Sequence, residues 1–329
     1  MNKAQQAQKE DLKIYELENS NGMKLRILNL GASVFQLLIK NKKGKLIDVA
    51  VGPKNPETFL TAQYEDENRC FGASVGRYAG RISNGRFELD GKEYLLSEKN
   101  GVHLHGGHRG LQHKLWKLEE QAENFLVLSC FSEDGEEGYP GDLEVKVKYS
   151  LTELNELIID YTAYTNKATP VNLTNHTYFN LNGEQDITDH ELFLDSEKIL
   201  QVDEKLRPTG NFVSLGTHKK NFSPSKPVGM TEVDDVYVLR KEKPEAARLF
   251  APQTGIEMKV STNQPAMIVY IPKELLQLWE YKTGHKEFPS ICLEAQNFPD
   301  APNHEKFPSS ILKPGEEYLN HTVFQFSLK

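Results

Sequence analysis

Cysteine is scarce in this sequence, with Cys70, Cys130 and Cys292 the only three among 329 residues. Their odd number and unpaired spacing predict reduced thiols in a cytoplasmic protein. Long apolar runs are also missing, and none approaches the roughly 20 residues that a membrane-spanning helix requires. Residues 1–11 are polar and lack the apolar core of a secretory signal. We therefore expect a cytoplasmic location and no membrane partner.

Positive charge is in deficit. Lysine and arginine total 39 against 47 aspartate and glutamate residues, which gives a net charge of -8 and argues against nucleic acid as a partner. Apolar residues make up 38% of the chain and mean hydropathy is -0.56, as in a soluble chain that can still bury a core. A serine nucleophile elbow and a phosphate-binding loop are absent, and GRYAG at 76–80 lacks the spacing of a dinucleotide fingerprint.

Helical periodicity is rare, and residues 56–65 predict at most a short helix. Apolar and polar residues instead alternate with a period of two, which is typical of half-buried strands. The clearest example is Leu143–Leu151, which a turn joins to residues 157–164, so the pair predicts an antiparallel hairpin. Further strands are expected at 125–131 and, as an N-terminal meander, at Lys24–Leu28, 35–40 and 45–51.

Turn dipeptides such as Asn84-Gly85 and Asp90-Gly91 recur along the chain and supply the positive φ that tight hairpins require. Neither βαβ alternation nor a linker-like break appears, which predicts one continuous all-β domain over residues 1–329. Residues 203–231 are rich in Pro, Gly, Lys and Ser, with weak strand character. We expect a long loop there, either functional or mobile.

Two distant segments carry the groups best suited to proton transfer. The segment NLTNHTYFNL at 172–181 places His176 among polar residues, and LEAQNFPD at 293–300 places Glu294 directly after an apolar run. A His and a Glu are a natural acid and base near neutral pH. A carboxylate in such a run risks burial, which demands partners or a raised pKa. A buried imidazole satisfied by its neighbours is the alternative interpretation of His176.

Residues 76–116 hold further candidates. His103, His105, His108 and His113 suggest a metal site, but no carboxylate follows closely, and Arg109 would repel a cation, so we expect no metal there. The glycines after His105 allow close approach of a ligand, which favours His105 for substrate contact.

Other charged residues each have two interpretations. Arg77 and Arg81 are each a surface charge or a guanidinium in a cleft. The pair Asp234-Asp235 is either solvated or suited to binding sugar hydroxyls.

The chain resembles the aldose 1-epimerase (galactose mutarotase) family over nearly its whole length. The resemblance rests on segments in the same order along the chain: GRYAGRI at 76–82, LHGG at 104–107, EGYPG at 137–141, NLTNH at 172–176, LEAQNFPD at 293–300 and LKPGEEY at 312–318. It implies a large antiparallel β-sandwich with an open sugar cleft, which agrees with the period-two pattern. It also implies an isomerase that interconverts the α and β anomers of free hexoses by ring opening and reclosure.

The resemblance assigns roles residue by residue. Glu294 is similar to the family's general base and His176 to its general acid. His105 falls on the histidine near the ring oxygen, Arg81 on the arginine that closes its segment, and Asp234 on the aspartate that holds sugar hydroxyls. No cofactor or metal is implied. The expected partner is a monosaccharide of the galactose or glucose class, and the expected assembly is a monomer or weak homodimer.

Three positions depart from the commoner family pattern, and they concern sugar preference more than reaction class. Gly80 stands where many members carry Asn, Asp235 where they carry His, and Ile268 where they carry Gln.

Three other functions remain open at this point. A glycosidase would use Asp234 with Glu294 as paired carboxylates, and a non-catalytic carbohydrate-binding protein would keep the cleft without turnover. An epimerase of phosphorylated hexoses would need the lysines of the 203–231 segment: Lys219, Lys220 and Lys226.

Overall fold

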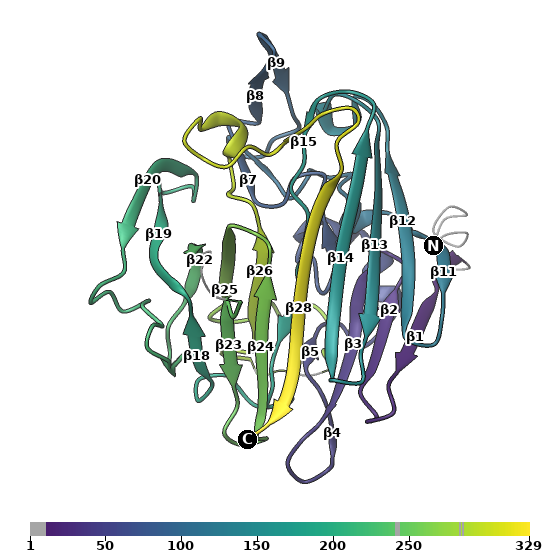
Figure 1. Cartoon of the computed structure of the whole chain (residues 1–329), viewed down its shortest axis with the longest axis vertical. Helices are drawn as coiled ribbons and strands as arrows, with labels where there is room; N and C mark the ends of the chain where they lie inside the picture. The colour runs from purple at the N-terminus through teal and green to yellow at the C-terminus, as the bar shows by residue number, and fades with distance from the viewer. Residues whose placement is uncertain (1–10, 241–243, 283, 285) are drawn as a thin grey trace.

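The computed structural model describes residues 11–240, 244–282, 284 and 286–329, and antiparallel strands dominate this part of the chain (Figure 1). The largest sheet of the described residues contains, in spatial order, β11 (Lys117–Gln121), β12 (Phe125–Ser132), β13 (Leu143–Leu151), β14 (Glu156–Thr165), β28 (Tyr318–Leu328), β24 (Ile256–Thr262), β23 (Ala247–Phe250), β18 (Glu191–Leu194) and β21 (Lys226–Pro227). The hairpin expected at 143–164 is its β13–β14 pair, and the strand expected at 125–131 is β12. The all-β prediction is therefore confirmed.

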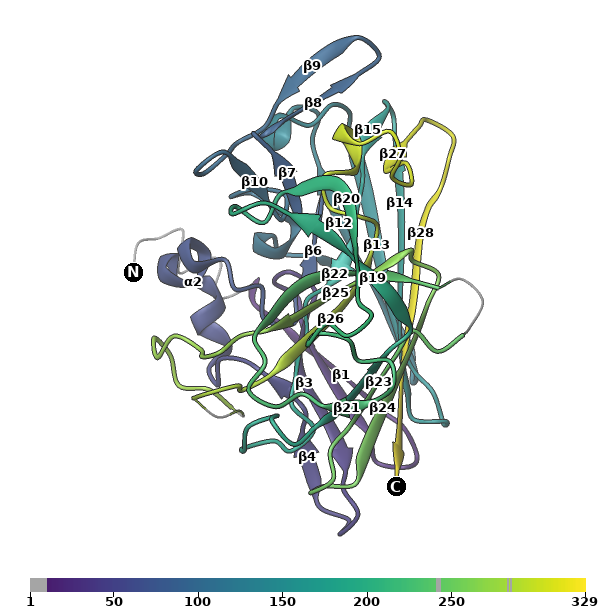
Figure 2. The same cartoon turned by 90° about the vertical axis from the view of Figure 1, so that its left-hand side faces the viewer.

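A second large sheet carries the cleft. Its order among the described residues is β20 (Pro208–Ser214), β19 (Ser196–Val202), β22 (Val233–Leu239), β25 (Ala266–Ile271), β26 (Ile291–Gln296), β17 (Tyr178–Phe179) and β5 (Ala50–Val51). Figure 2 shows β22, β25 and β26 side by side across the face turned to the viewer.

Smaller elements complete the fold. A further sheet runs in the order β1 (Ile14–Glu18), β2 (Lys24–Leu28), β3 (Ser33–Lys40) and β4 (Leu46–Asp48). The strand pairs are β6 (Ser74–Val75) with β16 (Thr174–Asn175), β7 (Arg81–Ser83) with β10 (Val102–Leu104), β8 (Arg86–Leu89) with β9 (Lys92–Leu95), and β15 (Thr169–Pro170) with β27 (Ile311–Leu312). The helical turns are η1 (Pro56–Leu60), α2 (Ala62–Glu67), η2 (Leu111–His113), η3 (Glu136–Gly138) and η4 (Ala301–Asn303). Within the described residues, no helix has the length and apolar character needed to cross a membrane.

The two large sheets share one apolar core. Alternate residues of β13 and β28, such as Val147 and Phe324, meet Val269 of β25 and Leu293 of β26 in a single buried cluster. All six residues of β26 are buried, because one face packs on this core and the other lies beneath the cleft. A central strand covered on both faces loses the polar–apolar alternation that marks a half-buried strand.

Two expectations about local structure need correction. The strand expected at 45–51 is split into β4 and β5, because the Asp48 carboxylate accepts hydrogen bonds from the N–H groups of Leu37 and Ala50 and turns the chain toward a different sheet. The 203–231 segment is not wholly loop, since it contains β20 and β21. Its strand character arises from pairing with β19 and β18, which local composition does not reveal.

Candidate active site

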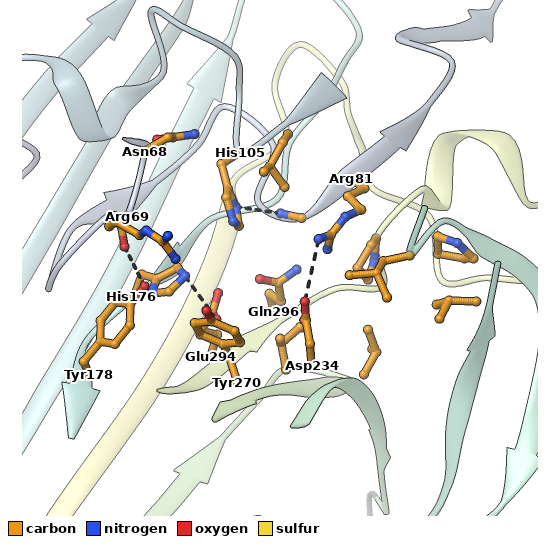
Figure 3. A pocket seen from close by; sticks show the side chains of 18 of the residues that line it. Asn68, Arg69, Arg81, His105, His176, Tyr178, Asp234, Tyr270, Glu294 and Gln296 are labelled. Carbon is orange, nitrogen blue, oxygen red and sulfur yellow. Dashed lines mark hydrogen bonds and ion pairs between the residues drawn. The ribbon is translucent and has the colours of Figure 1, made fainter. Parts of the chain in front are cut away.

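The cleft is built on the outer face of β26. Because strand side chains alternate, Glu294 and Gln296 share the face opposite the core. They line a cavity of about 230 Å³ together with His105, His176, Arg81 and Asp234 (Figure 3). The five residues proposed from the sequence therefore converge on one cavity, although they come from separate strands and loops.

His176 lies between β16 and β17, directly beside Glu294. Its backbone N–H donates to the carbonyl of Ala73 (2.9 Å), and its own carbonyl accepts from the N–H of Gly72 (3.0 Å). Its ring stacks on Tyr178 with centroids 5.0 Å apart. Nε2 of His176 lies 3.4 Å from Oε1 of Glu294, and both side chains are buried. The imidazole is thus fixed by backbone and by stacking, with one nitrogen aimed at the carboxyl group.

Burial shifts the proton affinities of this pair in opposite directions. Burial, and then the charge of Asp234, raises the pKa of Glu294 well above its usual value, although Arg81 opposes the shift. Burial lowers the pKa of His176 to about 4. Both shifts disfavour charge. The pair therefore holds one proton over a wide pH range, from the lowered pKa of His176 up to the raised pKa of Glu294. The pair can therefore both donate and accept a proton near neutral pH.

Arg81 and Asp234 form the opposite wall. Arg81 begins β7, Asp234 lies on β22, and their nearest nitrogen and oxygen are 3.7 Å apart. Burial raises the pKa of Asp234, while the Arg81 guanidinium lowers it. The two side chains offer donors and an acceptor at the same end of the cavity, which suits a ligand with several hydroxyl groups.

His105 lines the cavity as a neutral hydrogen-bond donor. Burial, followed by the charges of His176 and Arg81, lowers its pKa well below the usual range. Its Nδ1 accepts from the N–H of Gly80 (3.2 Å), which places the ring proton on Nε2. Its ring meets that of His176 edge to face at 5.6 Å.

Arg77 has neither of the roles considered from the sequence. It is 2% exposed, and its guanidinium donates to the carbonyls of Pro140 (3.1 Å), Gly141 (2.7 Å), Ser132 (2.9 Å) and Glu133 (3.2 Å). The surface-charge and cleft interpretations of Arg77 are both wrong, because the side chain ties the loop after β12 to the segment before β7.

Arg77→Met is expected to destabilise the protein by at least about 3 kcal/mol, because it leaves several buried carbonyls without donors. Urea unfolding of the variant and the wild type measures this difference. Arg86→Met is the matched control, since Arg86 is exposed and should cost less than about 0.5 kcal/mol. Equal losses in the two variants would contradict the anchoring role of Arg77.

The histidines of the 103–113 segment do not form a convergent set of metal-ligand atoms. His103 is buried and structural: its Nδ1 donates to the carbonyl of Ser97 (2.6 Å), and its Nε2 contacts the hydroxyl of Tyr139 (2.7 Å). In the described part of the chain, the one trio of ligand atoms that converges is that of His176, Cys292 and Glu294, all within 4.8 Å of one another. A metal there would occupy the same atoms that proton transfer needs.

Several cavity residues were missed from the sequence. Tyr178 and Tyr270 supply aromatic walls, and Asn68 and Arg69 lie at the rim after α2. Tyr178 carried a usable signal, since it follows His176 by two residues and shares its segment. Tyr270 faces the cavity only because β25 pairs with β26. Asn68 and Arg69 gave no local signal.

The three residues that depart from the common family pattern can be located relative to the cavity. Gly80 and Ile268 line the cavity, whereas Asp235 forms an ion pair with Lys220 beside it. The Nζ of Lys226 donates to the carbonyl of Lys219. None of the three lysines at 219, 220 and 226 is among the described residues that line the cavity, so they do not support a phosphate-binding role.

Comparisons with known proteins agree on one family. The family model described as aldose 1-epimerase matches residues 13–325. Galactose mutarotase of Homo sapiens is 38% identical, covering 94% of this chain and 92% of the relative. Aldose 1-epimerase of Escherichia coli strain K12 is 32% identical, covering 95% of each.

Solved structures match as well. An aldose epimerase homologue from C. elegans superimposes with a TM-score of 0.89 at 29% identity, covering 96% of this chain and 99% of that one. Galactose 1-epimerase from Lactobacillus acidophilus gives a TM-score of 0.83 at 26% identity, with coverage of 96% and 95%. The likeness therefore extends over the whole sandwich and is not confined to the cleft.

Proposed function

The chain belongs to the aldose 1-epimerase family of isomerases, and from this premise we propose that Glu294 and His176 carry the proton transfers by which it interconverts the α and β anomers of a free aldose. The observation that supports these roles is the 3.4 Å approach of the two buried side chains, which line one cavity. An acid and a base so placed need no cofactor.

The reaction begins with the proton of the pair. In the resting site it lies on Glu294, since burial favours the uncharged forms, and its transfer to His176 gives the reactive ion pair. Glu294 then takes the proton of the anomeric hydroxyl while His176 protonates the ring oxygen. The C1–O5 bond breaks, its electrons go to the ring oxygen, and C1 becomes an aldehyde. Rotation about C1–C2 and the reverse transfers close the ring on the other face.

Ring opening returns the pair to its uncharged state. It leaves Glu294 protonated and His176 neutral, which are the forms that burial favours. The cost of ionising the pair is therefore recovered as the bond breaks, and acceleration must come from groups that bind the transition state better than the substrate. His105 and Arg81 supply donors for the charge that develops on the ring oxygen, and Asp234 fixes the orientation of the ring through its hydroxyls.

Asp234→Asn is expected to lower kcat/KM about 10- to 100-fold, chiefly through KM, because it removes a charge-assisted acceptor from the bound sugar. Asp235→Asn is the matched control, since Asp235 pairs with Lys220 and does not line the cavity in the described residues. Mutarotation rates over a range of sugar concentrations separate the two parameters. An unchanged KM in Asp234→Asn would contradict this role.

The activity itself is tested by polarimetry or proton NMR on freshly dissolved α-glucose and α-galactose. The relaxation rate with protein should exceed the spontaneous rate in the same buffer at catalytic protein concentrations. A relaxation rate with protein that equals the spontaneous rate, for both sugars, would refute the proposal. Release of reducing sugar from an aryl glycoside would instead favour the glycosidase alternative.

We propose that residues 1–329 act as one domain, because a single apolar core joins strands from both ends of the described chain. We also propose a galactose- or glucose-class substrate, a monomer or weak homodimer, and a cytoplasmic location, for which the scattered, buried thiols are the support.

A further inference from the structure

Gln296 is a buried polar residue that the mechanism does not use. It is 0% exposed as a residue, yet it lines the cavity two positions after Glu294 on the same face of β26. A buried amide group in a strand normally finds partners for both its oxygen and its nitrogen. The hydrogen bonds around the amide of Gln296 therefore show which of its two polar atoms lacks a partner.

The amide of Gln296 has its donors used and its acceptor unused. Nε2 lies 3.3 Å from the carbonyl oxygens of Ala79 and Asn297 and donates to both. Oε1 has no hydrogen-bond partner among the described residues. Exchanging the two atoms would set an oxygen against two carbonyl oxygens, so the hydrogen-bond network fixes the orientation of the group. An orphaned buried acceptor of this kind is unfavourable until a donor arrives.

Gly80 packs closely against this amide. Its φ is +82°, and an added Cβ would lie 3.2 Å from Nε2 of Gln296 and 2.9 Å from Cγ of Pro299. A side chain there would be strained and would crowd the amide. The absence of a side chain at Gly80 thus lets the amide keep the position in which Nε2 donates and Oε1 has no partner among the described residues.

The order of side chains along the cavity indicates which ligand group meets Gln296. Figure 3 shows His176, then Glu294, then Gln296, and beyond them the Arg81–Asp234 pair. With His176 at the ring oxygen and Glu294 at the anomeric hydroxyl, the next substituent around the ring on that side is the C2 hydroxyl.

We propose that Gln296 is a specificity residue whose Oε1 accepts a hydrogen bond from the C2 hydroxyl of the bound aldose. This inference rests on the proposed function, which sets the position of the anomeric centre. A site with a buried acceptor discriminates strongly against a substrate that lacks the matching hydroxyl, because the acceptor is then left unsatisfied.

The test compares deoxy sugars in the wild type and in Gln296→Met, which keeps the length of the side chain without its amide. kcat/KM is measured for the parent hexose and its 2-deoxy, 3-deoxy and 6-deoxy forms, each corrected for its own spontaneous mutarotation. The preference for parent over 2-deoxy sugar should fall about 5- to 50-fold from wild type to variant, while the 3-deoxy and 6-deoxy preferences stay within about twofold.

The outcomes separate the inference from its premise. If the wild type does not accelerate even the parent sugar, the proposed function fails. If it does, but Gln296→Met leaves the 2-deoxy preference unchanged or changes the 3-deoxy preference instead, the role of Gln296 at C2 is overturned. Should Gln296→Met fail to fold, Gln296→Asn retracts the acceptor by one methylene and is subject to the same comparison.

Discussion

Glu294→Gln is expected to lower kcat for mutarotation by about 10²–10⁴-fold, the usual contribution of one positioned proton transfer. The amide has nearly the same shape as the carboxyl group but cannot take the proton of the anomeric hydroxyl. KM should change little, because the other sugar contacts remain and binding does not require a base. Polarimetry at several concentrations of α-galactose and α-glucose, with the spontaneous rate subtracted, measures both parameters.

The control must separate lost chemistry from lost structure. Glu257→Gln alters another buried glutamate, which contacts Arg248 and Lys259 at 3.8 Å and lies outside the cavity. Its kcat should match that of the wild type. Thermal unfolding provides a second check, because Glu294→Gln should be at least as stable as the wild type near neutral pH. Wild-type turnover in Glu294→Gln would show that another group is the base.

The direction of that stability difference follows from proton linkage. The pKa of Glu294 is raised in the folded protein above its unfolded value of 4.5. Above that unfolded value the folded state holds more protons, so the wild type loses stability as pH rises through the folded pKa. Glutamine has no such loss. Glu294 thus disfavours the fold at the pH where it would serve as a base, as is common for buried active-site groups.

Local pattern was sufficient for elements whose neighbours in sequence are also their neighbours in space. The β13–β14 hairpin is of this kind, because its alternation and its turn lie within one short stretch. Local pattern failed to predict strands that form because of their pairing and not because of their own composition. β20 lies in a segment whose composition predicts loop, and it exists as a strand because β19 offers an edge.

The residues of the site also divide into those that the sequence could indicate and those that it could not. Glu294 could be proposed because an acid that follows Ile291, Cys292 and Leu293 conflicts with its surroundings, and such conflicts are typical of functional sites. Arg77 was misjudged because sequence spacing does not show that four carbonyls surround it. Gln296 carries no conflict in sequence, and its orphaned oxygen is visible only in three dimensions.

The dependence of kcat/KM on pH should be a broad plateau. The reactive ion pair and the resting uncharged pair contain the same single proton, so pH does not shift one against the other. The rate falls only when the pair gains a second proton or loses its last one. The acid limit follows the pKa of His176, about 4, and the alkaline limit follows the raised pKa of Glu294.

This pH profile of kcat/KM differs from the profile expected for an acid and a base with unperturbed pKa values. With ordinary pKa values of about 4.3 and 6.5, the rate would peak near pH 5.4 and fall about tenfold per unit above 6.5, or about 30-fold by pH 8. The buried pair should instead keep nearly constant kcat/KM from about pH 5 through neutrality, and lose about tenfold per unit below about 4.

Initial rates at constant ionic strength, each corrected for spontaneous mutarotation at the same pH, decide between the two profiles. His176→Gln provides the matched variant: it should be slower by about 10²–10⁴-fold and should lose the acid limit near 4, because no imidazole remains to take the second proton. A narrow optimum between pH 5 and 6 in the wild type would mean that the two groups titrate independently in contact with water. In that case burial would not set their proton affinities, and the pair would not share one proton across the neutral pH range.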